Sequence, residues 1–275
     1  MDLPGLPRVA CNDRFMTWVY AHRGASATFA EHTRAAIISA LDQGADGIEV
    51  DLRLTKDGAV VLAHDATMRR IAGSPLRISH STLAQLQDLD IGSWHSGTAT
   101  ANDRATDRSM YTRIMTLHEL LELVVDHPRR PGLLLETKHP AQGGALLEPC
   151  VATVLRRFGL HDARATERPP ISVMSFSAAA LRRLRDVDSG ITRTLLMRPP
   201  RPIIRASQDA SAPAALGPSA AMFAREIDQF RQWQNAGGQV YVWTVNEPNV
   251  LRLCQSLPVD IVITDRPAWA AQLLT

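Results

Sequence analysis

The hydrophobic pattern near the start of the chain changes twice, which predicts a strand, a helix and a second strand. Residues 18–21 form a short apolar run typical of a buried strand. In residues 31–43 the apolar positions recur at helical spacing, and Gly44 provides a stop signal. Residues 47–54 alternate strictly between apolar and polar side chains, as a β-strand does. Strand, helix and strand in succession form the repeating unit of a parallel α/β sheet.

The second predicted strand carries two carboxylates on its polar face. Glu49 and Asp51 are two residues apart, so they point to the same side of a strand. Like charges this close repel each other unless a cation lies between them, which favours a divalent metal site. The alternative is an exposed hairpin whose charged face meets solvent, because it would show the same alternation.

The turn after this strand determines where His64 lies. Asp57-Gly58 separates the strand from a second apolar run, residues 59–64. An Asp-Gly pair favours a two-residue hairpin turn, since glycine accepts the positive φ that this turn requires. In that register Asp51 lies opposite His64, with Cβ atoms roughly 5 Å apart. We therefore expect His64 beside the carboxylate pair.

A third predicted strand, residues 132–138, contains Glu136 and Lys138 in an otherwise apolar run. Burying either charge without a partner would be costly. One interpretation is a structural ion pair between the two. The other is that Glu136 is a third metal carboxylate and Lys138 contacts a phosphate, because buried charges are rare and concentrate at functional sites.

Strands and helices continue to alternate to the end of the chain, with about eight strands in all. The weakest region is residues 199–218, expected to be irregular, followed by a short strand at residues 220–223. We predict an α/β fold: a (β/α)8 TIM-type barrel with a small insertion after the second strand, in one domain spanning residues 1–275. An open doubly wound sheet is the alternative, but no Gly-x-Gly-x-x-Gly follows the first strand.

The insertion, residues 65–113, interrupts the regular alternation. It contains a short predicted helix at residues 82–89 and a polar run from His95 to Ser109, whose lack of periodicity is typical of a loop. Insertions of this kind often cover a substrate, so we expect this segment to act as a lid that influences substrate choice. A solvated loop without a role is the alternative.

Short motifs that combine charged residues with glycine or strand residues occur along nearly the whole chain. They are His22-Arg23-Gly24, Ala30-Glu31-His32-Thr33, Gly47-Ile48-Glu49-Val50-Asp51, Thr55-Lys56-Asp57-Gly58, His64-Asp65, Glu136-Thr137-Lys138, Trp243-Thr244-Val245-Asn246 and residues 259–267. In this order they resemble the signature of the glycerophosphodiester phosphodiesterase family. That family usually has Pro-Glu-Asn-Thr where this chain has Ala30-Glu31-His32-Thr33, so His32 adds a titratable group near the site. It also usually has glycine at the position of Ile261.

The resemblance implies metal-dependent hydrolysis of glycerophosphodiesters to an alcohol and glycerol 3-phosphate. All-carboxylate ligation suits a hard cation, Mg²⁺ or Ca²⁺, and two histidines serve as general acid and base. The expected site residues are the metal ligands Glu49, Asp51 and Glu136, the catalytic histidines His22 and His64, and the substrate contacts Arg23, Lys138 and Trp243. Either histidine can be the base, and the nucleophile is either water or a neighbouring substrate hydroxyl.

Two other functions fit parts of this pattern. A phospholipase D of the related barrel group shares two histidines and a Glu/Asp pair, but the chain has no apolar membrane-docking segment. A catalytically silent barrel could bind a phosphorylated ligand, but both histidines and all three carboxylates are retained.

The composition narrows the class of protein further. A net charge of +2 over 275 residues and scattered arginines argue against nucleic-acid binding, and the expected partner is a small-molecule substrate. Residues 1–17 resemble no signal peptide and no run is long enough for stable membrane insertion, so we expect a cytoplasmic protein. Cys11, Cys150 and Cys254 are expected to be reduced structural cysteines. The sequence indicates no oligomeric state.

Overall fold

Parallel strands form the centre of the protein. The computed structural model describes residues 17–96, 107–139, 144–161, 170–199 and 213–274. The strands are β1 (Trp18–His22), β2 (Gly47–Leu54), β3 (Val60–Leu62), β4 (Gly132–Thr137), β5 (Ile171–Ser175), β6 (Arg193–Met197), β7 (Ala215–Pro218), β8 (Gln239–Val242) and β9 (Ile261–Thr264). They form one sheet in the order β1-β9-β8-β7-β6-β5-β4-β2-β3, which a further β1–β2 pairing closes. Every pairing is parallel except β2–β3, so eight strands form a closed parallel barrel and β3 is a hairpin partner of β2.

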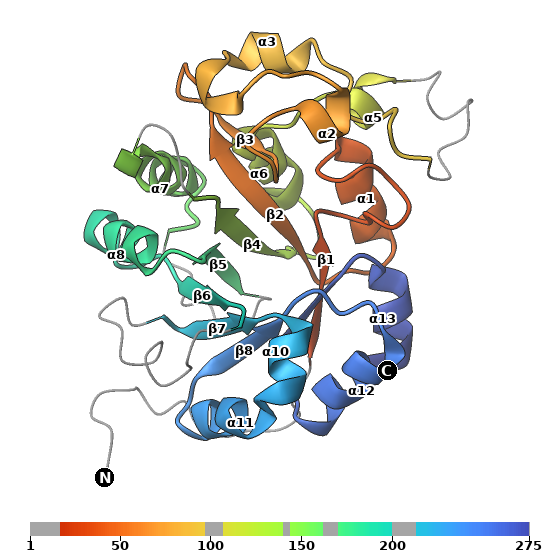
Figure 1. The fold of residues 1–275 in the computed structure, drawn as a ribbon, viewed down its shortest axis with the longest axis vertical. Helices are drawn as coiled ribbons and strands as arrows, with labels where there is room; N and C mark the ends of the chain where they lie inside the picture. The colour runs from red at the N-terminus through yellow and green to blue at the C-terminus, as the bar shows by residue number, and fades with distance from the viewer. Residues whose placement is uncertain (1–16, 97–106, 140–143, 162–169, 200–212, 275) are drawn as a thin grey trace.

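Helices follow the strands and cover the outside of the barrel (Figure 1). They are α1 (Arg34–Asp42), α6 (Leu117–Val125), α7 (Leu147–Arg157), α8 (Ala178–Val187), α10 (Ala220–Arg225), α11 (Ile227–Asn235), α12 (Pro248–Ser256) and α13 (Pro267–Leu274). Local capping fixes several starts; Thr116, for example, forms a reciprocal capping box with Glu119. The predicted (β/α)8 barrel is confirmed. No described helix is long and apolar enough to cross a membrane.

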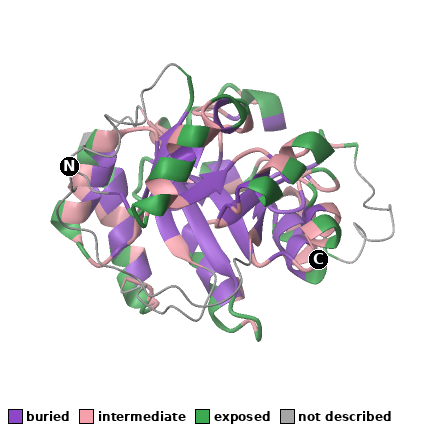
Figure 2. Cartoon of the chain, turned by 90° about the horizontal axis from the view of Figure 1, so that it is seen from below, coloured by how far each residue is buried: buried purple, intermediate pink, exposed green. Residues whose placement is uncertain are grey.

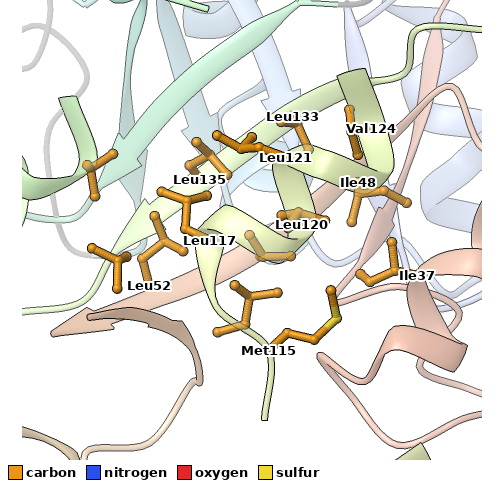
Figure 3. Packing of buried hydrophobic residues seen from close by; sticks show 14 of the residues in the cluster. Ile37, Ile48, Leu52, Met115, Leu117, Leu120, Leu121, Val124, Leu133 and Leu135 are labelled. Atoms are coloured by element: carbon orange, nitrogen blue, oxygen red, sulfur yellow. The ribbon is translucent and has the colours of Figure 1, made fainter. Parts of the chain in front are cut away.

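Alternate residues of each strand face the helices. Leu133 and Leu135 of β4 pack against Leu120 and Leu121 of α6 in one large cluster of buried residues (Figure 3). A second cluster joins the strands of the other half of the barrel to α8 and α10–α13. Figure 2 shows the resulting distribution, with buried strands in the centre and the exposed residues mainly on the outer faces of helices and on loops.

The remaining strand residues face the barrel axis. Leu134, Met174 and Leu196 belong to a separate cluster that also contains Tyr20 and Tyr241. Because side chains alternate along a strand, these interior positions and the outer positions interleave one by one. The same alternation decides which residues reach the rim of the barrel where the strands end.

The segment that follows β3 has hydrophobic packing of its own. It contains α2 (Arg69–Ala72), the 3₁₀ turn η1 (Ile78–His80), α3 (Leu83–Gln87) and α5 (Ser109–Thr112). Met68, Ile78, Leu86 and Ile91 pack together with Val61 of β3. Much of the predicted polar loop, at residues 97–106, lies outside the described residues, so a lid role for the 65–113 insertion stays a prediction.

The predicted two-residue turn between β2 and β3 is wrong. Leu54 pairs with Val60, which leaves a five-residue loop, residues 55–59, and shifts the register by one position. The Thr55 hydroxyl closes this wider turn because it accepts a hydrogen bond from Ala59 N at 2.9 Å and donates to Asp57 Oδ1 at 2.6 Å. The Asp57 carboxylate also accepts from Leu83 N, so it is bound to α3.

The expected order of strand and helix near residue 218 is also wrong. β7 lies within the segment predicted to be irregular, and the predicted strand at residues 220–223 is the first part of α10. Ser219 caps that helix by accepting a hydrogen bond from Met222 N. A Cβ at Gly217 would lie 2.8 Å from Leu196 Cδ2, so a larger residue in β7 would require that side chain of β6 to shift.

We expect Leu120→Ala to lower the free energy of unfolding by about 2–5 kcal/mol, because it opens a cavity between α6 and the strands. Leu146→Ala is the control, since that side chain is 57% exposed and its loss should cost less than about 0.5 kcal/mol. Urea unfolding of both variants checks this. Equal effects would contradict the packing described for α6.

Candidate active site

Three carboxylates converge at the carboxyl-end half of β2 and β4. One oxygen from each of Glu49, Asp51 and Glu136 lies within 4.8 Å of the others, and all three side chains are buried. Strand register explains this, because Asp51 pairs with Glu136 and Glu49 lies two residues before Asp51 on the same face. The three predicted metal ligands are thus brought together.

The electrostatics of this cluster favour an additional positive charge. Burial, with the neighbouring Asp51 carboxylate, raises the pKa of Glu136 to about 7 and raises the pKa of Glu49 well above its usual value. Glu49 Oε2 and Asp51 Oδ2 are buried and accept no hydrogen bond from the described part of the chain. Buried acceptors in native proteins are normally satisfied. The oxygen-only donor set and its unsatisfied atoms therefore fit a hard divalent cation such as Mg²⁺ or Ca²⁺.

Two basic side chains already lie against the cluster. Lys138 Nζ is 2.8 Å from Glu136 Oε1 and 2.9 Å from Asp51 Oδ1, while Arg23 Nε is 3.0 Å from Asp51 Oδ2. Burial would raise the pKa of Asp51, but the Arg23 and Lys138 charges hold it well below its usual range. The structural Glu136–Lys138 ion pair therefore exists. With two of its three ammonium donors directed at Asp51 and Glu136, Lys138 keeps one for another acceptor.

His22 is oriented by a carboxylate at the end of the last strand. Its Nδ1 lies 2.6 Å from Asp265 Oδ1, and its Nε2 lies 3.9 Å from Glu49 Oε2. Asp265 also accepts hydrogen bonds from Ser26 and Asn246, which together with His22 outweigh the effect of burial and lower the pKa of Asp265 to about 2. An ionised Asp265 that accepts the Nδ1 proton leaves Nε2 facing the acidic cluster.

His64 is held in the same way by a different aspartate. Its Nδ1 lies 2.8 Å from Asp65 Oδ1, and Asp65 Oδ2 accepts a hydrogen bond from Arg70 at 2.6 Å. Burial and the Arg23 charge lower the pKa of His64, which favours the neutral ring. The shifted register puts Ala63, not His64, against Asp51, with Ala63 N donating to Asp51 O. The Asp51 charge opposes this lowering of the His64 pKa, so the electrostatics of His64 remain linked to the carboxylate cluster.

Arg70 of α2 joins the insertion to the site. It donates to both oxygens of Glu31, at 3.0 and 2.6 Å, and Glu31 also accepts from Arg23 at 3.1 Å. The guanidinium of Arg70 lies 5.6 Å from the ring centre of Trp94. Arg70 was not predicted as a site residue, because the chain offers no local signal for it.

Asp265 and Asn246 were also given no individual role. Both directly follow predicted strands, and carboxyl ends of barrel strands are where functional side chains gather. That position was the available signal for them.

His32 is not the titratable group that was expected near the site. It is 2% exposed, and burial lowers its pKa to about 3, so its ring stays neutral. Its Nε2 accepts a hydrogen bond from Asp51 N at 3.1 Å, so it helps to hold the backbone of Asp51 in place. The helix predicted from Glu31 begins only at Arg34, because Thr33 is its N-cap.

Trp243 lies just after β8, at the same end of the barrel as the carboxylates. Its indole donates to Gly217 O at 2.7 Å, and its ring meets the edge of Phe176 with centroids 5.5 Å apart. Outside the site, Cys150 and Cys254 are free thiols, as expected, and Cys11 lies outside the described residues.

Comparison with known proteins decides the family. Residues 22–269 match the family model described as the glycerophosphoryl diester phosphodiesterase family. The chain belongs to this family. In two strains of Mycobacterium tuberculosis, a relative named "Probable glycerophosphodiester phosphodiesterase 1" is 37% identical over 257 residues, covering 92% of this chain and 92% of the relative.

Solved structures agree with this assignment. An Oleispira antarctica phosphodiesterase, in complex with the product sn-glycerol-3-phosphate, has a TM-score of 0.78 at 25% identity and covers 94% of this chain and 96% of its own. A Thermotoga maritima glycerophosphodiester phosphodiesterase has a TM-score of 0.68 at 25% identity, covering 94% of this chain and 98% of its own. The predicted enzyme class, a glycerophosphodiester phosphodiesterase, is confirmed by the family.

The raised pKa of Glu136 makes a prediction about stability without metal. A carboxyl group whose pKa is higher in the folded protein binds its proton more tightly there, so ionisation costs stability as pH rises from about 4.5 to about 7. At about 1.4 kcal/mol per pKa unit, the full cost is about 3 kcal/mol and persists above pH 7. We expect Glu136→Gln to raise the unfolding free energy of the chelated protein at pH 8 by up to that amount, and little at pH 4.5.

The control for this measurement is Glu122→Gln, a change on the exposed face of α6. With saturating Mg²⁺ or Ca²⁺ we expect the wild type to have the higher unfolding free energy, because only the wild type keeps all three proposed ligands. Denaturant unfolding at both pH values, with chelator or cation, tests this. The same pH dependence in both variants would contradict the burial of an ionisable Glu136.

Proposed function

We propose that this protein hydrolyses glycerophosphodiesters to an alcohol and sn-glycerol 3-phosphate in a reaction that requires Mg²⁺ or Ca²⁺. The observation that carries the proposal is the convergence of three buried carboxylates beside two histidines that each have their own aspartate. The Oleispira antarctica phosphodiesterase supports the same product here, since its structure is in complex with the product sn-glycerol-3-phosphate.

Glu49, Asp51 and Glu136 would hold the cation. Glu49 Oε2 would gain most from it, because it accepts no hydrogen bond within the described ranges, whereas Asp51 Oδ2 already has the Arg23 guanidinium 3.0 Å away. A bound divalent cation supplies charge neutralisation for the phosphate oxygens of an anionic substrate.

The basic side chains bind and orient the phosphodiester. Lys138 and Arg23 present fixed positive charge beside the carboxylate cluster, where it would stabilise negative charge that develops on phosphate oxygens. His22 and His64 then move the protons: one takes a proton from the nucleophile at Nε2 and the other gives one to the leaving oxygen. One P–O bond forms to the nucleophile and one breaks to the alcohol. Trp243 contacts the organic part of the substrate.

The direct test of this function is release of sn-glycerol 3-phosphate from a glycerophosphodiester. We expect release with Mg²⁺ or Ca²⁺, none with EDTA, and recovery when excess cation is restored. Unchanged activity in EDTA would contradict the metal role, whereas no release under any condition would contradict the hydrolytic one.

Removal of either histidine should cost most of the acid/base contribution. We expect kcat/KM to fall by about 10²–10⁴ for His22→Ala and for His64→Ala. Because both act in one reaction, the double variant should lose far less than the product of the single losses. Measurements on one substrate at saturating cation check this.

His118→Ala is the control for the histidine variants. Its side chain is 62% exposed on α6 and packs edge-on to Phe158, away from the carboxylates. We expect no change in its kcat/KM. A loss for His118→Ala as large as for His22→Ala would show that these effects are not specific to the site.

A further inference from the structure

The inward-facing positions of the strands continue onto the rim of the barrel. Met174 of β5 and Leu196 of β6 fill the interior. Two residues further along each strand come Phe176 and Arg198, which therefore continue the inward face past the strand end. In the same way, Lys138 lies two residues after Glu136 and just past the end of β4.

Arg198 lies over an aromatic pair on this rim. Its guanidinium carbon is 5.2 Å from the centre of the Phe176 ring, and Phe176 in turn meets Trp243 edge-on. The Arg198 side chain is exposed, and within the described ranges no carboxylate forms an ion pair with it. An arginine placed on an aromatic face without an acidic partner presents its donors to solvent.

The position of β6 places Arg198 across the rim from His22. Around the closed barrel the order is β1-β2-β4-β5-β6-β7-β8-β9, so β6 is the fourth neighbour of β1 in either direction. His22 and the carboxylates come from β1, β2 and β4. A substrate whose phosphodiester lies at the carboxylates would extend the rest of its length toward Phe176 and Arg198.

The chemistry of this side of the rim selects among substrates by charge. Two aromatic rings alone would suit a quaternary ammonium group such as choline. Here the Arg198 guanidinium already covers the Phe176 ring and repels a second cation. Its planar fork of donors matches a phosphate or carboxylate instead.

We infer that Arg198 makes this enzyme prefer glycerophosphodiesters whose alcohol carries a second anionic group, such as a further phosphate, over those with a choline head group. The inference rests on the proposed function and adds the substrate class to it.

A matched pair of substrates tests the inference. Glycerophosphoglycerol has a neutral alcohol, and bis(glycerophospho)glycerol extends the same alcohol with a second phosphate. For the wild type we expect kcat/KM to be higher on the second, and lowest on glycerophosphocholine. Arg198→Gln should lower the ratio of kcat/KM values, second substrate to first, by about three- to tenfold, as expected for a partly solvated charge contact.

Two further readouts separate charge recognition from a structural effect. Added salt should lower the ratio in the wild type but not in Arg198→Gln, because screening acts only where the charge is present. Arg198→Lys should keep part of the preference, whereas Arg198→Glu should shift it toward glycerophosphocholine. Arg252→Gln, on the exposed side of α12, is the matched control and should leave the ratio unchanged.

The outcomes distinguish this inference from the proposed function. If the wild type releases glycerol 3-phosphate but Arg198→Gln leaves the ratio unchanged, or if glycerophosphocholine is the best substrate, the charge preference is wrong and the hydrolytic function stands. If the wild type hydrolyses none of the three diesters, the proposed function fails and the inference fails with it.

Discussion

Burial of negative charge is the constraint around which the site is built. Glu49, Asp51 and Glu136 offer oxygens within 4.8 Å of one another, in an interior from which water is largely excluded. Mutual repulsion and desolvation both oppose their ionisation, and the pKa values of Glu49 and Glu136 rise accordingly. Arg23 and Lys138 offset part of this cost through Asp51, but within the described ranges Glu49 Oε2 accepts no hydrogen bond. A bound divalent cation would offset the remaining repulsion among these carboxylates.

Closure of the barrel brings together residues from opposite ends of the chain. His22 ends β1, and Asp265 follows β9, 243 residues later. They meet because β1 pairs with both β9 and β2, so the closing seam of the barrel lies beside the carboxylates of β2. His64 instead interacts with Asp65, the next residue in the chain. Arg70 donates hydrogen bonds to both Asp65 and Glu31. The two histidines therefore depend on different parts of the fold.

Strand alternation links packing to chemistry throughout. On β4, Leu133 and Leu135 stabilise the contact with α6, while Leu134 and Glu136 face the barrel axis. A shift by one residue would exchange these roles and bury the carboxylates against helices. The same rule that gives the protein its core therefore selects which residues reach the catalytic rim. It also places Arg198 of β6 on the opposite side of the rim from His22 of β1.

Local sequence determined the fold class and much of the site, because a period-two pattern fixes which strand residues share a face. Glu49 and Asp51 could be placed together from that pattern alone. The β2–β3 register could not, since the wider turn depends on the Thr55 hydroxyl and on a contact between Asp57 and Leu83, 26 residues later.

Tertiary structure alone decided the remaining features. β7 is a strand because it pairs with β6 and β8, against the local signal, and His32 is neutral because it is buried. Asp265 reaches His22 only because the sheet closes. Each of these depends on distances between segments far apart in the chain, which propensity and periodicity do not encode.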